Sequence, residues 1–341
     1  MLDKFFEALY LKVFVNIVLK NSSTMVYIEM YSKKGAIDNI QMEFETTTLD
    51  EKMLEFITRY TKESPYYYIA MLDSSSLQGA LPTCSKNRFS YYKDLSNYEY
   101  KCYDGKWTYY TSKTELYELE KRYELIGLDF IFSPFVILAN YFQDKINSSL
   151  ALYALVQEGF ISIAVFKESQ LLYAEHLDIA SKGDADDILL SDQMADEEID
   201  LDLDSGIDLE SITIEDESSE IDNFSDIEDL DSIEEIDEFD DSKDIEEELL
   251  ESDEILEEAG NATFNEDYQR FSMIQSSIAR FYKDERYESQ FLENIYIADG
   301  VGVSSDLKKY LEEEMFLNVY IRHLEVDSEV CELLKEELGL L

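Results

Sequence analysis

Histidine and cysteine are among the side chains most often used as nucleophiles, proton carriers or metal ligands near neutral pH, and they are few here. The chain has His176, His323, Cys84, Cys102 and Cys331. Neither histidine has a serine or cysteine partner in a recognisable motif, and no Gly-x-Ser-x-Gly or Cys-x-x-Cys occurs. We therefore expect no catalytic triad and no metal site, and we interpret the cysteines as reduced thiols of a cytoplasmic protein. The acidic neighbours of His176 predict a strand residue with a raised pKa.

Acidic residues dominate the composition and are concentrated in one segment. The chain has 77 Asp and Glu against 28 Lys and Arg, a net charge of −49. This balance excludes nonspecific nucleic-acid binding through a basic surface. Residues 183–258 hold 36 of the acids and a single base. Such a segment cannot bury enough apolar surface to fold, so we expect a disordered insertion, either a spacer or a docking tract for a basic partner.

Outside this segment, the same order of strands and helices occurs twice. In the first pass, β-branched and aromatic runs predict strands at 11–19, 24–31, 36–46, 66–72 and 128–133, with helices at 49–62, 112–126 and 135–147. In the second pass, strands are predicted at 150–157, 160–167, 170–177, 294–298 and 317–322, with helices at 266–290, 306–315 and 328–338. Both passes read βββαβαβα, which indicates a duplicated α/β unit.

A βββαβαβα unit used twice resembles the ribonuclease-H-like duplication of actin, Hsp70 and the sugar kinases. Gly127–Phe142 (GLDFIFSPFVILANYF) and Ile295–Ile321 (IYIADGVGVSSDLKKYLEEEMFLNVYI) are similar to segments of PilM from type IV pilus assembly and of the cytoplasmic domain of GspL from type II secretion. The resemblance implies two actin-like lobes. The first covers 1–133 with an aromatic hairpin insertion at 83–110, and the second covers 134–182 and 259–341.

The resemblance also implies a nucleotide cleft, and its first phosphate turn is altered here. In that superfamily an Asp and a glycine turn hold magnesium and phosphate. Residues 15–24 (VNIVLKNSST) have no carboxylate and no glycine, so Asn16 or Asn21 stands near the Asp position. Ser22, Ser23 and Thr24 remain as phosphate donors, and the alternative is an ordinary polar hairpin turn.

The two other nucleotide turns implied by the resemblance are also weak. The second phosphate turn has Glu158 and Gly159, and a carboxylate repels a phosphate. The adenosine turn retains Gly300 and Gly302 after Asp299, a pattern that a plain strand-to-helix turn explains equally well. We therefore expect a vestigial cleft that uses no cofactor and does not hydrolyse ATP.

The irregular segment 83–110 is rich in aromatic residues, and we predict that it binds a partner. Its candidate contact residues are Tyr91, Tyr92, Tyr103, Trp107 and Tyr109. Large aromatic residues dominate the binding energy of many interfaces. The alternative is that the segment covers its own lobe.

Two classes of function remain. The first is a non-catalytic scaffold of a pilus, secretion or DNA-uptake (competence) machine that binds the tail of an inner-membrane protein and the assembly ATPase. The second is an active actin-like or sugar-kinase-like ATPase. No apolar stretch reaches transmembrane length and no signal peptide is evident, so we expect a cytoplasmic protein held at the inner membrane by its partner.

Overall fold

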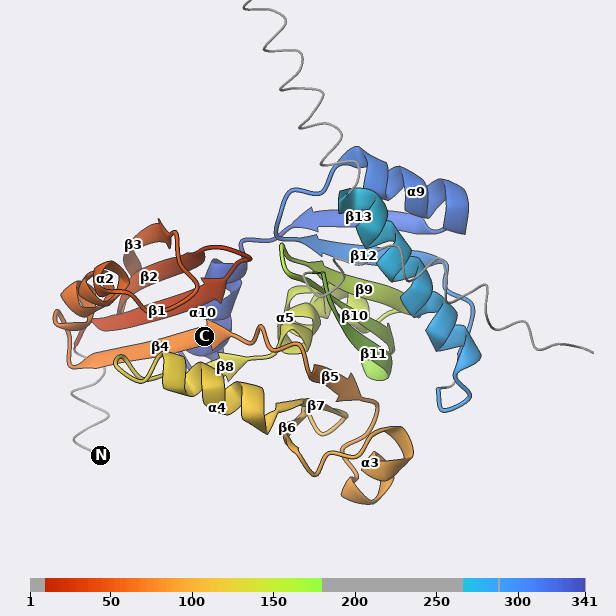
Figure 1. Cartoon of the computed structure of the whole chain (residues 1–341), viewed down its shortest axis with the longest axis horizontal. Coiled ribbons are helices and arrows are strands. Elements are labelled where there is room, and N and C mark those ends of the chain that lie inside the picture. The colour runs from red at the N-terminus through yellow and green to blue at the C-terminus, as the bar shows by residue number, and fades with distance from the viewer. Residues whose placement is uncertain (1–9, 180–265, 288, 341) are drawn as a thin grey trace, which may run out of the picture. The chain divides into compact units, whose positions relative to one another are not determined.

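The computed structural model describes residues 10–179, 266–287 and 289–340, in three sheets (Figure 1). The disordered insertion predicted at 183–258 lies outside the described residues. Among those residues, no helix is long and apolar enough to cross a membrane.

The first sheet has the strand order β3-β2-β1-β4-β8. Its strands are β1 (Lys12–Leu19), β2 (Thr24–Ser32), β3 (Gly35–Phe44), β4 (Tyr66–Leu72) and β8 (Phe130–Phe132). The first three strands pair antiparallel, and β4 and β8 continue the sheet in parallel. Helices α2 (Glu51–Thr61) and α4 (Lys113–Arg122) bury apolar side chains against one face of this sheet.

The second sheet repeats this arrangement in the order β11-β10-β9-β12-β13. Its strands are β9 (Ala151–Val156), β10 (Phe160–Lys167), β11 (Gln170–Asp178), β12 (Asn294–Asp299) and β13 (Asn318–His323). Three antiparallel strands are again followed by two parallel ones. The helix at 266–283 and α9 (Ser305–Met315) cover one face. The repeat predicted from the sequence is therefore present.

The remaining faces of both sheets share one apolar cluster with the linking helices. These helices are α5 (Pro134–Tyr141), α6 (Gln143–Ile146) and α10 (Val326–Glu337). Although α10 follows β13 of the second sheet, it packs against β1, β2 and β4 of the first sheet (Figure 1). The sequence-based division assigns this segment to the second lobe, whereas its buried face completes the core of the first.

A third, small sheet is inserted between β4 and α4, with the order β5-β7-β6. It consists of β5 (Gln78–Leu81), β6 (Tyr98–Tyr103) and β7 (Trp107–Ser112), and α3 (Lys86–Tyr92) lies between β5 and β6. We call residues 78–112 the aromatic subdomain. The sequence predicts a hairpin here and misses α3, which buries only Phe89.

Candidate functional site

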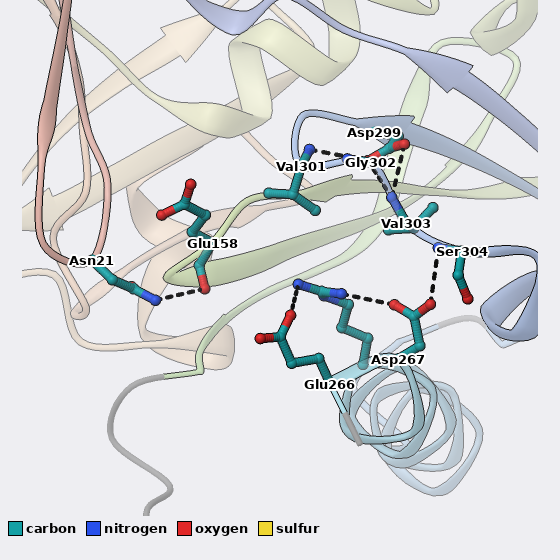
Figure 2. A network of polar contacts seen from close by, with 10 residues as sticks. Asn21, Glu158, Glu266, Asp267, Asp299, Val301, Gly302, Val303 and Ser304 are labelled. Atoms are coloured by element: carbon teal, nitrogen blue, oxygen red, sulfur yellow. Dashed lines mark hydrogen bonds and ion pairs between the residues drawn. The ribbon is translucent and has the colours of Figure 1, made fainter. Parts of the chain in front are cut away.

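The two turns expected to hold phosphates are in direct contact with each other (Figure 2). Nδ2 of Asn21, in the β1–β2 turn, donates to the carbonyl oxygen of Glu158, in the β9–β10 turn, at 3.3 Å. The ammonium of Lys20 lies 3.8 Å from the Glu158 carboxylate. A Cβ at Gly159 would come within 2.8 Å of Oδ1 of Asn21. A phosphate could enter between these turns only by separating them.

The hydroxyls proposed as phosphate donors are used inside the first lobe. Oγ of Ser23 donates to Glu43 at 2.6 Å, and Oγ1 of Thr24 donates to the carbonyl of Thr46 at 2.6 Å. Ser22 is exposed beside them. Hydrogen bonds from Ser23 and Lys20 lower the pKa of Glu43, so a carboxylate stands at this turn at neutral pH. Asn16 is fully buried within β1 and does not reach the turn.

The backbone amides of the glycine turn already have acceptors (Figure 2). Oδ1 of Asp299 accepts from the amides of Val301, Gly302 and Val303 at 2.8 to 3.1 Å. The amide of Gly300 donates to the carbonyl of Val156. Gly302 has a φ of +81°, which glycine adopts without strain, and a Cβ at Gly300 would collide with Nε2 of Gln157. The turn is therefore closed around its own aspartate.

A second set of charges fixes the helix at 266–283 to the same turn (Figure 2). Asp267 accepts from the amide of Ser304 at 2.9 Å and lies 2.7 Å from the guanidinium of Arg270. Glu266 binds the same guanidinium at 3.0 Å. Asp267 is fully buried and Arg270 is 6 % exposed. The neighbourhood of Gly300 and Gly302 thus contains several carboxylates, which disfavour a polyphosphate.

The histidines do not form a catalytic pair. Nδ1 of His176 lies 2.8 Å from Oγ of Ser162, and its ring packs against Phe160. Burial lowers the pKa of His176 to about 4. The predicted raised pKa is therefore wrong, because burial disfavours the imidazolium and neither acidic neighbour in the sequence offsets it. Within the described residues, no three His, Cys, Asp or Glu side chains are grouped as a metal site.

The five aromatic residues predicted to bind a partner do not share one surface. Trp107 is 2 % exposed and packs against Tyr103 and against Phe166 of the second lobe, with ring centroids 4.7 and 5.9 Å apart. Trp107 is therefore a packing residue inside the aromatic subdomain, and its side chain is not exposed for contact with a partner. Tyr92 lies 5.8 Å from the ring of Tyr287, and Tyr91 is 57 % exposed.

Tyr103 and Tyr109 instead line a groove between the aromatic subdomain and the first sheet. We call it the β8 groove. Its larger part has a volume of about 710 Å³, and a smaller part of about 260 Å³ continues past Tyr109 toward α4. Strand β8, an edge strand of the described sheet, runs along both parts. Trp107 and Phe166 also line the larger part, together with Phe130, Ile131, Phe132, Val136, Ala139 and Ile146.

The expectation of three reduced thiols is also wrong. Cys84 and Cys102 form a disulfide in the aromatic subdomain, with Cα atoms 5.5 Å apart, and Cys331 is a buried free thiol. The segment before α3 returns to the side of β6, so two cysteines that are 18 residues apart in the sequence meet. No spacing rule reports such a contact.

Comparison with known proteins places the chain in a family. Residues 152–339, more than half of the chain, match a domain of unknown function named DUF8341. The chain belongs to the DUF8341 family. Residues 10–139 match a second domain of unknown function, DUF8569. A search of curated proteins finds no match to this DUF8341 chain.

Solved structures similar to this DUF8341 member cover nearly its whole length. The PilM-PilN type IV pilus biogenesis complex matches 96 % of this chain and 98 % of that chain, with 10 % identity and a TM-score of 0.50. A Bacteroides thetaiotaomicron protein with an actin-like ATPase fold and unknown function matches 94 % and 95 %, with 12 % identity and a TM-score of 0.46. The ethanolamine utilization protein EutJ from Carboxydothermus hydrogenoformans matches 91 % and 84 %, with 8 % identity and a TM-score of 0.35.

The repeated strand order and the likeness to the first of these structures establish an actin-like fold for this DUF8341 chain. The predicted fold class is confirmed.

Proposed function

We propose that this protein is a non-catalytic cytoplasmic scaffold that holds the tail of an inner-membrane protein in the β8 groove. The machine would be a pilus, secretion or DNA-uptake assembly, with its assembly ATPase as a second partner. The observation that carries the proposal is the groove itself, which follows an edge strand and has an aromatic wall. The similar PilM-PilN complex is an assembly of type IV pilus biogenesis and supports the same direction.

The groove suits an extended peptide. Both β8 and β6 are edge strands among the described residues, so each has a row of backbone groups on its outer side. A peptide that adds to an edge strand gains main-chain hydrogen bonds, and sockets for its side chains give specificity. Tyr103, Tyr109 and Phe130 supply apolar walls for such sockets.

The expected tail is basic as well as apolar. Cytoplasmic segments next to membrane helices carry an excess of Lys and Arg. The larger part of the groove is lined by more carboxylates than ammonium groups: Asp104, Asp129, Glu336 and Glu337 against Lys101 and Lys106. Lys101 reaches across to Glu337 at 3.1 Å, so an incoming cation can compete for that exposed carboxylate. Charge complementarity raises the rate of encounter more than the final affinity.

The nucleotide turns support a role without catalysis. Asn21 contacts Glu158 between the two expected phosphate turns, and Asp299 occupies the amides of the glycine turn. Binding of Mg-ATP would require both contacts to break and several carboxylates to tolerate a polyphosphate. Breaking these contacts and placing phosphates beside carboxylates both cost free energy, and a scaffold that does not bind nucleotide avoids both costs.

Binding of tail peptides tests the proposal. Labelled peptides with the cytoplasmic N-terminal sequences of inner-membrane proteins from the source organism would be titrated with the full chain and followed by anisotropy. Ala139, 8 % exposed on α5, lines the groove, and Ala139→Arg places a long cation there. We expect the dissociation constant to rise about tenfold or more.

The matched control is Tyr117→Arg, because Tyr117 is 63 % exposed on α4 and does not line the groove. It should leave the affinity unchanged. The proposal fails if a tail binds folded Ala139→Arg as well as the original protein, or if no tail binds and the chain hydrolyses ATP.

A further inference from the structure

The disulfide lies in the wall of the β8 groove. Cys102 is in β6, is exposed and lines the groove, whereas Cys84 is half-buried in the segment between β5 and α3. The next residue, Tyr103, packs against Trp107 with ring centroids 4.7 Å apart and the planes tilted by 34°, and it forms the aromatic wall. Because Cys102 and Tyr103 are adjacent in β6, breaking the disulfide frees the backbone next to the tyrosine that lines the groove.

Apart from Tyr103, the side chains of this part of the wall make their contacts at exposed positions, such as the ion pair of Lys101 with Glu337 at 3.1 Å and the ring contact of Tyr100 with Phe89. In the described sheet, β6 pairs only with β7, and its residues from Glu99 to Cys102 are exposed. The small core of the aromatic subdomain consists of Leu81, Phe89, Leu95 and Tyr110. A core of this size stabilises little structure without a cross-link. The Cys84–Cys102 bond ties the free side of β6 to the segment that precedes α3.

The third cysteine cannot take part in thiol exchange at the groove. Cys331 is fully buried on the inner face of α10, and burial together with the nearby Glu29 carboxylate raises its pKa to about 12. The thiolate is the reactive form, so Cys331 is inert at neutral pH. The chain therefore has one disulfide with an exposed cysteine and one buried thiol that does not react with it.

We propose that the Cys84–Cys102 disulfide is a redox switch for docking in the β8 groove: the oxidised chain holds its ligand and the reduced chain releases it. The reductant is a dithiol. Its thiolate attacks one sulfur of the bond, a mixed disulfide forms, and its second thiol displaces the protein sulfur. Two electrons and two protons pass to the chain, which gains two thiols, and the dithiol becomes a disulfide. Because the cytoplasm keeps accessible thiols reduced, the resting chain is the releasing form. Docking follows when a disulfide of another molecule reoxidises the pair by the reverse exchange, and that molecule leaves as a dithiol.

This inference rests on the proposed function for its ligand, but its main readout does not. Trp107 is the only tryptophan of the chain and stands in the same wall. Reduction of the full chain with excess dithiothreitol should shift its emission to the red and increase acrylamide quenching. Hydrogen exchange should accelerate at β6 and β7 and stay slow at β1 and β9. Cys84→Ser/Cys102→Ser should behave as reduced in every buffer, and Cys331→Ser should respond as the original protein does.

The same samples would be titrated with the tail peptide that binds the oxidised protein. We expect the dissociation constant to rise about tenfold or more on reduction, since the loosened wall must be ordered again for binding. The switch is overturned if the tail binds both states with equal affinity. It is also overturned if reduction changes neither the quenching of Trp107 nor the hydrogen exchange at β6. Either result leaves the docking function intact. If no tail binds in either state, the docking function fails, and an unresponsive Trp107 would then overturn the switch separately.

Discussion

The Nζ atom of Lys335, in the last helix described, lies 2.7 Å from Oε1 of Glu29 in β2 of the first sheet. The two side chains are 4 % and 6 % exposed, and Glu332 binds the same ammonium at 2.6 Å. Burial by itself would lower the pKa of Lys335, but hydrogen bonds to Glu29 and Glu332 outweigh it and raise the pKa. A buried ion pair therefore fastens α10 to the first sheet.

Removing one partner of this pair should be costly. Lys335→Met leaves the carboxylate of Glu29 buried without a counter-charge, and we expect a loss of about 3–5 kcal/mol in the free energy of unfolding, measured with urea. The control Lys308→Met removes an exposed pair with Glu312, and should change stability by about 0.5 kcal/mol or less. A loss under about 1 kcal/mol for Lys335→Met would show that water reaches the pair.

Trp107→Ala should lower the stability of the folded protein, because the side chain is buried and not exposed at a binding surface. The indole is 2 % exposed between Tyr103 and Phe166, so its removal leaves a cavity. We expect a loss of about 3–5 kcal/mol in the free energy of unfolding. Tyr91→Ala, at a side chain that is 57 % exposed, should stay within about 0.5 kcal/mol. Equal stability of the two variants would mean that the wall does not depend on Trp107.

His176 should make the fold sensitive to mild acid. Its pKa is about 4 in the folded chain, and an unfolded histidine titrates near 6.5. The unfolded state therefore binds more protons between these values, so stability falls as the pH drops from about 6.5 to about 4. Allowing for partial exposure, the loss is on the order of 2 kcal/mol.

Denaturation with urea across this pH range measures the contribution of His176. The variant His176→Gln should lose less stability than the original protein as the pH falls. His323→Gln, at an exposed histidine, should follow the original protein. Parallel curves for all three proteins would contradict the low pKa of His176.

Calorimetric titration with Mg-ATP should give no heat, or a dissociation constant weaker than about 1 mM, which corresponds to roughly −4 kcal/mol. Asn21→Ala removes the contact with Glu158 and should not restore binding, because Asp299 still occupies the glycine-turn amides. Micromolar binding with hydrolysis by the original protein would instead support the alternative of an active ATPase.

Much of the fold is readable from the sequence, because the strands carry strong local signals. The strands predicted at 66–72 and 160–167 have the same bounds as β4 and β10. Each of these strands ends where charged and polar residues begin. Helix α3 is missed because KNRFSYY is only seven residues long and buries only Phe89, so it has no helical repeat of apolar residues. The crossing of α10 to the first sheet depends on tertiary packing, which periodicity does not encode.

The site was readable only in part. The sequence locates the turns at Ser22 to Thr24 and Gly300 to Gly302, and the Asp299-Gly300 pair signals an Asx-type turn that uses its own carboxylate. Their role in binding stays a prediction. The contact of Asn21 with Glu158 joins turns that are 137 residues apart, and no local pattern reports it. The β8 groove and the Cys84–Cys102 bond also arise from the meeting of distant segments.

The crossing of α10 has a consequence for biosynthesis. The face of the first sheet that holds Glu29 is covered by α10, which is synthesised about 300 residues later. At typical translation speeds this interval is on the order of tens of seconds, during which Phe14, Val18 and Tyr27 lack their cover. We therefore expect chaperones to bind the nascent chain at this face, and ribosome stalling just before residue 326 should yield a protein in which the face stays exposed.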